Sequence, residues 1–489
     1  MAQLFDWVGR YYVDTVNIGK LAEDAIRKTL KELDPHSVYI PKDEVLAMTE
    51  PLRGSFEGIG ISFSTLNDTI LIISVVPGGP SEKTGIRNGD KIITIDQDTV
   101  AGKGIKTMDI HKRLRGKKGS EVIVEILRKG EKGLLTFHII RDKIPIHSIA
   151  SYYKVNKDIG YIRLTRFSAS SKKEFDDALK ILKKEGAKSL ILDLTGNGGG
   201  YIDVAVQLAS NFFDKGQLIV YTEGDKNKRL NYMAASGGSF KKGKLVIMID
   251  ENSASASEIV AGAIQDWDRG LIVGRRSFGK GLVQREMFFG DSSMIRLTIS
   301  RYHTPTGRMI QKPYHTEDSE YDKGVYTRLQ TGELTGETTI KIADSLKFKT
   351  LVEGRTVYGG GGITPDIFVP VDTAHYNDYY NKLLGKGIFS RFILNYVDKN
   401  RLRLEQDYPV FETFNKKFQV SESTLKELQD FAQKEGLERQ PEQFAQSKNY
   451  LKLWIKGYIA RDLWSISELY QVINQEDPIF LKAVDEIQK

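Results

Sequence analysis

Two short segments of this sequence carry a serine and a lysine whose surroundings suit a nucleophile and its base. Ser255 follows the apolar run 245–249 and precedes apolar residues at helical spacing. A serine at a helix start lies beside unpaired backbone N–H groups and the positive end of the helix dipole, which stabilise an oxyanion. Ser255 and Glu258 also have the spacing of a capping box. On the local pattern alone, a helix cap without catalysis remains the alternative.

Lys280 is the residue best placed to act as the base. A serine hydroxyl is a poor nucleophile until a base takes its proton. The seven histidines show no Ser-His-Asp arrangement. A lysine can serve when it is neutral, which requires a pKa roughly 3 units below about 10.4, or about 4 kcal/mol. An apolar setting without a carboxylate favours this, and no acidic residue occurs between Asp268 and Glu286. If the chain is extended after Lys280, Gln284 lies on the same face and can hold the amine by a hydrogen bond.

Two further motifs resemble catalytic sequences. Residues 274–281 nearly form a nucleotide-binding P-loop, but that motif requires Ser or Thr after its lysine, and then a helix. Here Gly281 follows the lysine, and residues 282–289 have the composition of a strand. Ser170 and Lys173 have the S-x-x-K spacing of penicillin-binding enzymes, but the companion motifs are missing. We interpret Ser170 and Lys173 as the solvated first turn of a helix.

Composition narrows the class of protein. The chain has 489 residues, enough for about three domains. Its net charge is +7, but 71 basic residues are interspersed with 64 acidic ones, so we expect no nucleic-acid partner. The lack of cysteine excludes disulfides, thiolate catalysis and cysteine-ligated zinc. Catalysis by a serine and a lysine would need neither a metal nor a cofactor, and we expect none. There is no apolar run of about 18 residues and no export signal at the N-terminus. The protein is therefore either cytoplasmic or preceded by a removed export segment.

Four regions position these residues. Residues 1–52 are predicted to be helical. Residues 53–142 show short alternating strands, glycine and proline turns, and one helix near 107–114. Residues 143–372 alternate strands with helices, which predicts right-handed βαβ units and a largely parallel sheet, interrupted by a polar insertion near 313–350. Residues 373–489 are predicted to be helical again, with a capping box at Thr424-x-x-Glu427. Their apolar stripes fit a core better than a dimer face.

The second region resembles a PDZ domain. The resemblance is carried by Gly58-Ile59-Gly60-Ile61, by the Val-Pro-Gly-Gly-Pro-Ser segment at 76–81, and by residues 85–92. In PDZ domains the glycine-rich segment offers backbone N–H groups to the terminal carboxylate of a ligand, which adds to the sheet as a strand. Gly58 and Gly60 suit such a close approach of two backbones. The resemblance implies that Gly58, Ile59, Gly60 and Ile61 bind a peptide.

Residues 1–372 as a whole resemble the carboxyl-terminal processing peptidases, or tail-specific proteases. The resemblance rests on the Ser-Ala-Ser-Ala-Ser-Glu helix start, Phe-Gly-Lys-Gly at 278–281, and the segments 33–37 and 300–308. It implies an α/β multidomain fold with a crotonase-like βαβ protease core, an inserted PDZ domain, and helical N- and C-terminal regions. It also assigns roles to six residues. These are the nucleophile Ser255, the base Lys280, the supporting Gln284, and backbone oxyanion donors at Ala256 and at Gly199 or Gly200.

The sequence departs from the family pattern in the glycine loop. Thr195 stands where the family has an arginine, and Gly198 stands where a proline is common. Neither change removes a catalytic group, but both leave the rigidity of the loop open.

The resemblance implies a serine endopeptidase that recognises polypeptides by their free, apolar C-termini and cleaves through an acyl-enzyme. It also implies a periplasmic or otherwise extracytoplasmic location, tethered to a membrane by a segment outside this sequence, and it allows for an adaptor or activator and a homo-oligomer. The alternative is a non-catalytic PDZ scaffold with a degenerate protease core.

Overall fold

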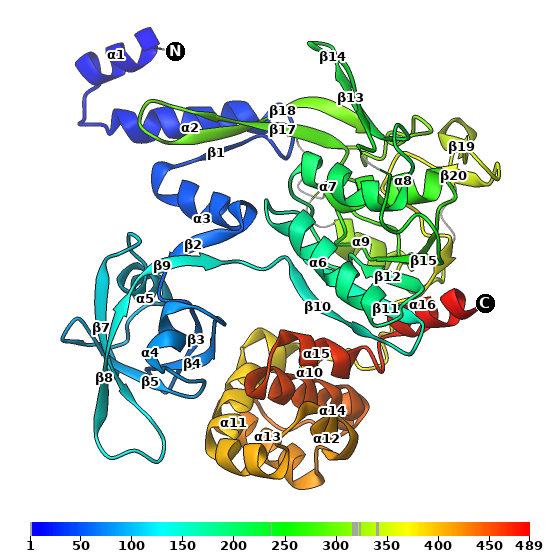
Figure 1. Cartoon of the computed structure of the whole chain (residues 1–489). Helices are drawn as coiled ribbons and strands as arrows, with labels where there is room; N and C mark the ends of the chain where they lie inside the picture. Colours follow the sequence, from blue (N-terminus) through cyan, green and yellow to red (C-terminus); the bar gives the residue numbers. More distant parts are fainter. Residues whose placement is uncertain (1, 236, 315–320, 322–323, 339–341) are drawn as a thin grey trace. The chain divides into compact units, whose positions relative to one another are not determined.

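The computed structural model describes residues 2–235, 237–314, 321, 324–338 and 342–489 (Figure 1). The chain divides into two compact units. The first comprises Met1–Gly54, Tyr152–Val371 and Lys482–Lys489, and the second comprises Ser55–Ser151 and Asp372–Leu481. All residues singled out for catalysis therefore belong to the first unit.

A mostly parallel sheet is the centre of the first unit. Its strands in spatial order are β10 (Ile149–Lys154), β11 (Ile159–Leu164), β12 (Ser189–Asp193), β15 (Leu245–Ile249), β16 (Leu271–Gly274) and β21 (Ile367–Phe368). From β11 to β21 all neighbouring pairs are parallel. Every residue of β15 is buried, as its continuous apolar run requires for an interior strand of a parallel sheet. The predicted parallel sheet is confirmed.

Helices α6 (Ser171–Lys184), α7 (Ile202–Ala209) and α8 (Ala256–Asp266) pack side by side, α6 against β11 and α8 against β16 (Figure 1). A 3-10 turn, Ser210–Phe212, continues α7. All residues of α8 are buried. The helix that begins after Ser255 is therefore held on all sides.

A second, antiparallel sheet supports the same unit. Its strands are β1 (Val38–Ile40), β18 (Met294–His303), β13 (Leu218–Gly224), β14 (Asn227–Met233) and β17 (Leu282–Phe288), of which β17 pairs with β18. The strand β1 pairs antiparallel with β18, so the prediction that residues 1–52 are helical holds only for α1 (Ala2–Tyr11), α2 (Ile18–Lys31) and α3 (Lys42–Arg53). The three-residue run Val-Tyr-Ile is too short for a periodic signal, and its partner strand lies more than 250 residues further along the chain.

The described part of the polar insertion contains a helix, a 3-10 turn and a strand pair. It contains α9 (Gly324–Gln330), a 3-10 turn at Asp344–Leu346, and β19 (Lys347–Lys349), which pairs with β20 (Thr356–Tyr358). Within the predicted insertion, residues 315–320, 322–323 and 339–341 lie outside the described residues.

The first part of the second unit is a β-domain. Its main sheet has the order β3 (Ile61–Leu66), β4 (Thr69–Val75), β5 (Lys91–Ile95), β7 (Glu121–Leu127) and β8 (Leu134–Ile140), with β6 (Asp98–Thr99) beside β5. A separate pair is formed by β2 (Ser55–Gly58) and β9 (Asp142–Pro145), and the helices are α4 (Pro80–Thr84) and α5 (Thr107–Leu114). The helix predicted near 107–114 is present.

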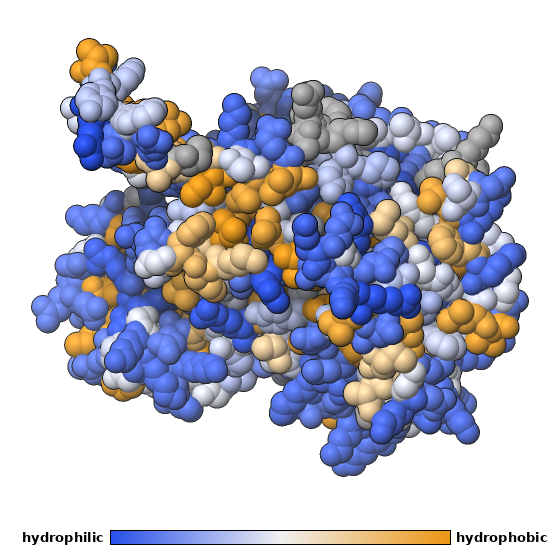
Figure 2. Space-filling view, turned by 90° about the horizontal axis from the view of Figure 1, so that it is seen from above, coloured by the Kyte–Doolittle hydropathy of each residue, from blue (hydrophilic) through white to orange (hydrophobic). Residues whose placement is uncertain are grey.

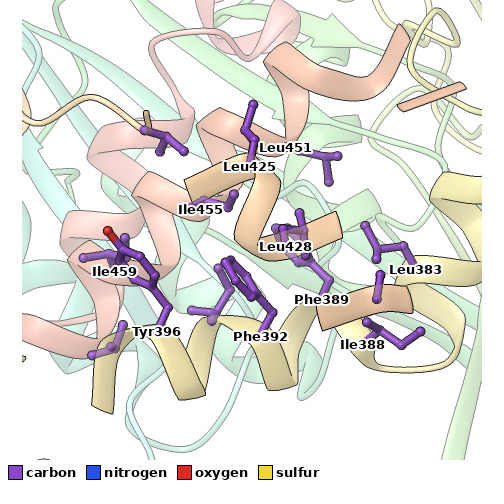
Figure 3. Packing of buried hydrophobic residues seen from close by; sticks show 14 of the residues in the cluster. Leu383, Ile388, Phe389, Phe392, Tyr396, Leu425, Leu428, Leu451, Ile455 and Ile459 are labelled. Carbon is purple, nitrogen blue, oxygen red and sulfur yellow. The ribbon is translucent and has the colours of Figure 1, made fainter. Parts of the chain in front are cut away.

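The rest of the second unit is helical, as predicted. It contains α10 (Asp378–Gly385), α11 (Ile388–Asp407), α12 (Phe411–Lys417), α13 (Glu422–Lys434), α14 (Pro441–Leu463), α15 (Ile466–Ile473) and the start of α16 (Pro478–Gln488). Leu383, Phe392, Leu428 and Ile455 belong to its buried core (Figure 3). The cap of α13 differs from the prediction, because Ser421 accepts the Thr424 N–H at 3.1 Å and the helix begins at Glu422.

Hydrophilic residues cover most of the face seen in Figure 2, with hydrophobic patches between them. Among the described residues, no helix has both the length and the apolar character needed to cross a membrane.

Candidate active site

Ser255 occupies a strained turn between β15 and α8. Its backbone dihedrals, φ 56° and ψ −112°, lie in a region that residues with a Cβ rarely adopt. Such a conformation costs about 1–3 kcal/mol and persists only where the surroundings impose it. The Ala254 N–H donates to the Asn197 carbonyl at 3.0 Å, and the hydroxyl of Tyr302 lies 3.1 Å from the Ser255 carbonyl. Ser255 therefore lies in the turn between β15 and α8, and these two hydrogen bonds fix the backbone of the turn.

The Glu258 carboxylate joins the backbone of the serine to the backbone of the lysine. One carboxylate oxygen accepts the N–H groups of Ser255 at 2.7 Å and of Lys280 at 2.9 Å. The other accepts the Ser277 hydroxyl at 2.6 Å and the Gly279 N–H at 2.7 Å. The bond from Ser255 is the capping-box contact expected from the sequence, so the cap is real. The contacts to residues 277–280 show that the same carboxylate also holds the lysine loop.

The ionisation of Glu258 is set by opposing effects. Burial raises the pKa of Glu258, and the hydrogen bonds from Ser277, Lys280, Gly279 and Ser255 reduce this rise without cancelling it. If Glu258 were protonated, its O–H would need an acceptor, but the four groups that contact the carboxyl are all donors to it. We therefore treat Glu258 as a carboxylate.

Lys280 lies in the loop between β16 and β17, flanked by two glycines that the loop requires. Gly279 has φ 87°, and a Cβ on Gly281 would lie 2.9 Å from the Gln311 nitrogen. The Lys280 Nζ donates to Gln284 Oε1 at 2.9 Å, so the expected amine–amide hydrogen bond is present. The Gln284 amide nitrogen in turn donates to the His36 carbonyl. This second bond orients the amide so that its oxygen faces the lysine.

The surroundings of Lys280 favour the neutral amine. Burial lowers the pKa of Lys280 below its usual value of 10.5, and the positive charge of Arg296 lowers it further. The carboxylates of Asp34 and Glu258 act in the opposite direction but do not prevent the decrease. The sequence interpretation was wrong that no carboxylate lies near the lysine, because both acids are distant in the chain and close in space.

Tyr302 is a second link between the two halves of the site. Its hydroxyl donates to the Lys280 carbonyl at 2.7 Å and lies 3.1 Å from the Ser255 carbonyl. The side chain is buried, and burial raises the pKa of this phenol well above 10. Within the described part of the chain no hydrogen bond joins the Ser255 hydroxyl to the Lys280 amine. Tyr302 therefore fixes the backbones of Ser255 and Lys280 relative to each other.

The glycine loop approaches the serine so closely that a side chain could not fit. A Cβ on Gly199 would lie 2.8 Å from both the Ala254 carbonyl and the Ser255 Cβ, and Gly199 has φ 101°. Its own N–H donates to the Asn197 side chain at 2.9 Å. The N–H groups of Gly200 and Ala256 have no partner among the residues described. Of the two glycines named from the sequence, the N–H of Gly199 is therefore already engaged, and that of Gly200 has no partner among the described residues.

Asn197 holds this loop, and the sequence analysis did not single it out. Its side chain is fully buried and donates to the Leu164 carbonyl at 2.8 Å. Its carbonyl accepts the Ala254 N–H at 3.0 Å and the Ser257 hydroxyl at 2.8 Å. Asn197 therefore connects the glycine loop to residues on both sides of Ser255. Because asparagine is common in turns, its presence in this loop did not indicate such a role.

The weaker sequence candidates lie outside this site. Ser170 donates to Glu174 at 2.6 Å and Lys173 pairs with Asp177. Lys173 is exposed as expected, but Ser170 is half-buried, so the start of α6 is solvated only in part. The lysine of the P-loop-like segment is Lys280 itself, and a strand follows it, β17, rather than a helix. Among described residues, no group of three or more His, Asp or Glu side chains could hold a metal.

The four PDZ residues named from the sequence lie in the second unit, at the junction of β2 and β3. Gly60 has φ 78°, which only glycine adopts readily. The Ile59 carbonyl accepts the N–H of Ser81 at 3.1 Å and its hydroxyl at 2.7 Å, and the Gly60 carbonyl accepts the Val76 N–H at 2.9 Å. These bonds fix the glycine-rich segment beside the start of β3.

Three segments of the chain match known protein families. Residues 158–321 match peptidase family S41, residues 58–139 match the PDZ domain family, and residues 379–465 match a family of unknown function, DUF8443. The chain therefore combines a peptidase core with a PDZ domain, and both predicted assignments are confirmed. The crotonase-like detail of the core stays a prediction.

Related proteins narrow the class to one family. Carboxy-terminal processing protease CtpA of Bacillus subtilis (strain 168) is 34% identical over 346 residues, which cover 68% of this chain and 72% of CtpA. CtpB of the same organism is 37% identical over 315 residues, 63% of this chain and 64% of CtpB, slightly under two thirds of its length. The solved photosystem II D1 C-terminal processing protease is 26% identical, with 76% of this chain and 93% of that chain covered and a TM-score of 0.38. The chain belongs to peptidase family S41 and is similar to the carboxy-terminal processing serine proteases.

Proposed function

We propose that this chain is an endopeptidase that captures polypeptides by their free C-termini and cleaves them with a dyad of Ser255 and Lys280. The observation that carries the proposal is the joining of the two residues by one carboxylate, since Glu258 accepts the backbone N–H of both. A link of this kind fixes a nucleophile relative to a base, which a helix cap alone does not need.

In the proposed reaction, the neutral amine of Lys280 takes the proton of the Ser255 hydroxyl as the oxygen attacks the scissile carbonyl. Gln284 holds the amine without supplying charge. The N–H groups of Ala256 and Gly200 donate to the oxyanion. The Lys280 ammonium then gives its proton to the leaving amine, and an acyl-enzyme remains on Ser255. A water molecule that has lost a proton to Lys280 hydrolyses this ester.

The remaining assignments rest on the family. The PDZ residues Gly58 to Ile61 would bind the terminal carboxylate of an apolar tail, and the four-region division at 52, 142 and 372 remains the proposed domain plan. We propose an extracytoplasmic, periplasmic location, with a membrane tether outside this sequence. The resemblance also allows for an adaptor or activator and for a homo-oligomer.

Proteolysis of an unfolded reporter with a free apolar tail tests the proposal. Wild type should cleave it, and Ser255→Ala or Lys280→Ala should lower kcat/KM by at least about a thousandfold. Ser170→Ala and Lys173→Ala are matched controls, because they remove the same residue types from the start of α6, outside the candidate site, and should leave the rate unchanged. An amidated reporter should be cleaved more slowly. Equal cleavage by all variants would contradict the dyad, and intact reporter with every protein would favour a non-catalytic PDZ scaffold.

A further inference from the structure

The outer strand of the PDZ domain has one unpaired edge and two chemically different faces. Among the residues described, β3 pairs only with β4. A peptide that adds to such an edge continues the sheet, and its side chains alternate between the two faces. Ile61 and Phe63 pack against the domain's own core, and Phe63 lies against His111 of α5, with ring centroids 5.0 Å apart. One set of ligand side chains therefore faces α5.

The other face of β3 is lined by small side chains. Ser62 and Ser64 alternate with Phe63 and therefore point away from α5. Ser74 of β4 stands directly opposite Ser62 in the antiparallel register. Serines fill little space, so the sheet leaves room on this side, where the second set of ligand side chains would point.

Helices of the C-terminal region enclose that room. Leu394 of α11 packs into a buried cluster with Leu66, Leu71 and Ile73 of the PDZ hairpin. Lys91 and Asp398 form an ion pair at 2.8 Å with both side chains about three-quarters buried. The Lys129 ammonium donates to the Asp398 carbonyl at 3.1 Å. These contacts hold α11 against the β3–β4 hairpin.

Between the hairpin and the helices lies a cavity of about 750 Å³. Ser62, Phe63, Ser64 and Ser74 border it on the strand side, and its apolar wall includes Ile393, Tyr458 and Trp464. The cavity is large enough for several side chains, and part of its lining comes from β3, the strand with the unpaired edge. An apolar wall facing a strand edge has the composition of a pocket for extended polypeptide.

We infer that this cavity binds the second set of side chains of the captured polypeptide tail. The inference rests on the proposed capture of a tail by the PDZ domain and deepens it, because it assigns the C-terminal helical region a part in substrate selection. A PDZ domain alone reads alternate residues of its ligand and leaves the others in solvent. Here both sets meet a wall, α5 on one face and α11, α14 and α15 on the other. The favoured tail therefore has consecutive apolar residues rather than alternating ones.

Peptide binding tests the inference independently of cleavage. The protein carries Ser255→Ala, and the probe is a fluorescent six-residue apolar peptide with a free C-terminus, substituted by Asp at each position in turn. The positions should fall into two interleaved sets, and an Asp at any position of either set should weaken binding about tenfold. In the Ile466→Asp background the cavity wall is charged, so the apolar preference of only one set should disappear. Leu384→Asp is the matched control, because Leu384 is 41% exposed, Ile466 is 42% exposed, and only Ile466 lines the cavity.

The outcomes separate this inference from the proposal beneath it. If Asp at the other set of peptide positions still weakens binding to the Ile466→Asp protein, the PDZ groove is intact. A second variant, Ser390→Trp, should fill the cavity and give the same result as Ile466→Asp. If only one set of positions matters in every protein, the cavity reads nothing and the inference is wrong, while tail capture stands. If no peptide binds even without the substitutions, tail capture fails and the inference with it. If the wild-type protein forms a dimer and Ile466→Asp abolishes it, the cavity binds a second copy of this chain, and the inference is wrong.

Discussion

The most informative single change is Glu258→Gln, because it keeps the size of the side chain and removes its charge. The carboxylate accepts four hydrogen bonds, two at each oxygen, from Ser255, Ser277, Gly279 and Lys280. A glutamine can satisfy only one of these pairs, since its nitrogen donates where the second oxygen accepted. Turned either way, the amide nitrogen faces at least one buried backbone N–H that then has no acceptor.

The magnitude follows from these contacts. A buried donor without a partner costs about 1–3 kcal/mol. The two bonds that remain at the amide oxygen lose the charge that roughly doubles their strength, so a total loss of about 2–4 kcal/mol is expected. If half of this falls on the transition state, kcat decreases about 5- to 30-fold at 1.36 kcal/mol per tenfold, and if all of it does, about 30- to 1,000-fold. The rest should appear as a lower free energy of unfolding.

A second measurement distinguishes a positioning role from simple loss of stability. The negative charge of Glu258 raises the pKa of Lys280, so its removal should move the ascending limb of the pH–kcat profile to lower pH. The control is Asp366→Asn, because Asp366 also accepts a backbone N–H, from Ile272 at 2.8 Å, and pairs with Arg355 in the same unit. It should lower Tm and leave kcat unchanged. A Glu258→Gln enzyme with kcat within twofold of wild type and an unmoved pH limb would refute the reasoning.

Three further predictions concern the same site. Because burial lowers the pKa of Lys280, kcat/KM should rise with pH through a midpoint below 10.5, and a midpoint at or above 10.5 would contradict a desolvated base. The same decrease in pKa means that the unfolded chain binds this proton more tightly than the folded chain, so Lys280 destabilises the fold increasingly as pH falls below 10.5. Lys280→Met should therefore raise Tm near neutral pH, and this gain in Tm should vanish towards pH 10.5. Gly199→Ala should abolish cleavage, because its Cβ would meet Ala254 and Ser255 at 2.8 Å, whereas Gly198→Ala has nothing within 4 Å and should remain active.

The parts of the site that the sequence predicted are those made by residues close together in the chain. Ser255 and Glu258 are one helical turn apart, and Lys280 and Gln284 lie on the same face of an extended segment, so spacing in the sequence was enough to suggest each pair. The βαβ alternation of the core and the strands of the PDZ region were predictable for the same reason, since periodicity is a local signal.

The parts that escaped prediction are contacts across the chain. The Glu258 carboxylate reaches the Gly279 N–H, 21 residues away, and the Gln284 amide reaches the His36 carbonyl, 248 residues away. Tyr302 lies in a segment whose resemblance was noted, but nothing in its type or spacing showed that its hydroxyl meets the Lys280 carbonyl. Such contacts depend on how sheets pack, and a single sequence carries no periodic mark of them.

The departure at Thr195 leads to a last prediction. Where the family has an arginine, Thr195 leaves the buried Asp193 without a cation from its own loop, and Arg163 of β11 supplies one. The Arg163 guanidinium pairs with Asp193, and it donates to the Thr195 hydroxyl at 2.7 Å and to the Thr195 carbonyl at 3.0 Å. In this chain a guanidinium from the neighbouring strand therefore anchors the start of the glycine loop.

Arg163→Met should leave the Asp193 carboxylate buried and unpaired, at a cost of about 3 kcal/mol to the free energy of unfolding. It should also lower kcat, because the loop that begins at Thr195 carries the proposed oxyanion donor Gly200. Adding Thr195→Arg to that variant returns a guanidinium beside the same carboxylate and should restore both Tm and kcat. Arg163→Lys keeps the charge but loses the two-pronged contact, so an intermediate loss is expected. Wild-type kcat in Arg163→Met, or no recovery in the double variant with Tm restored, would show that this ion pair stabilises the core without positioning the loop.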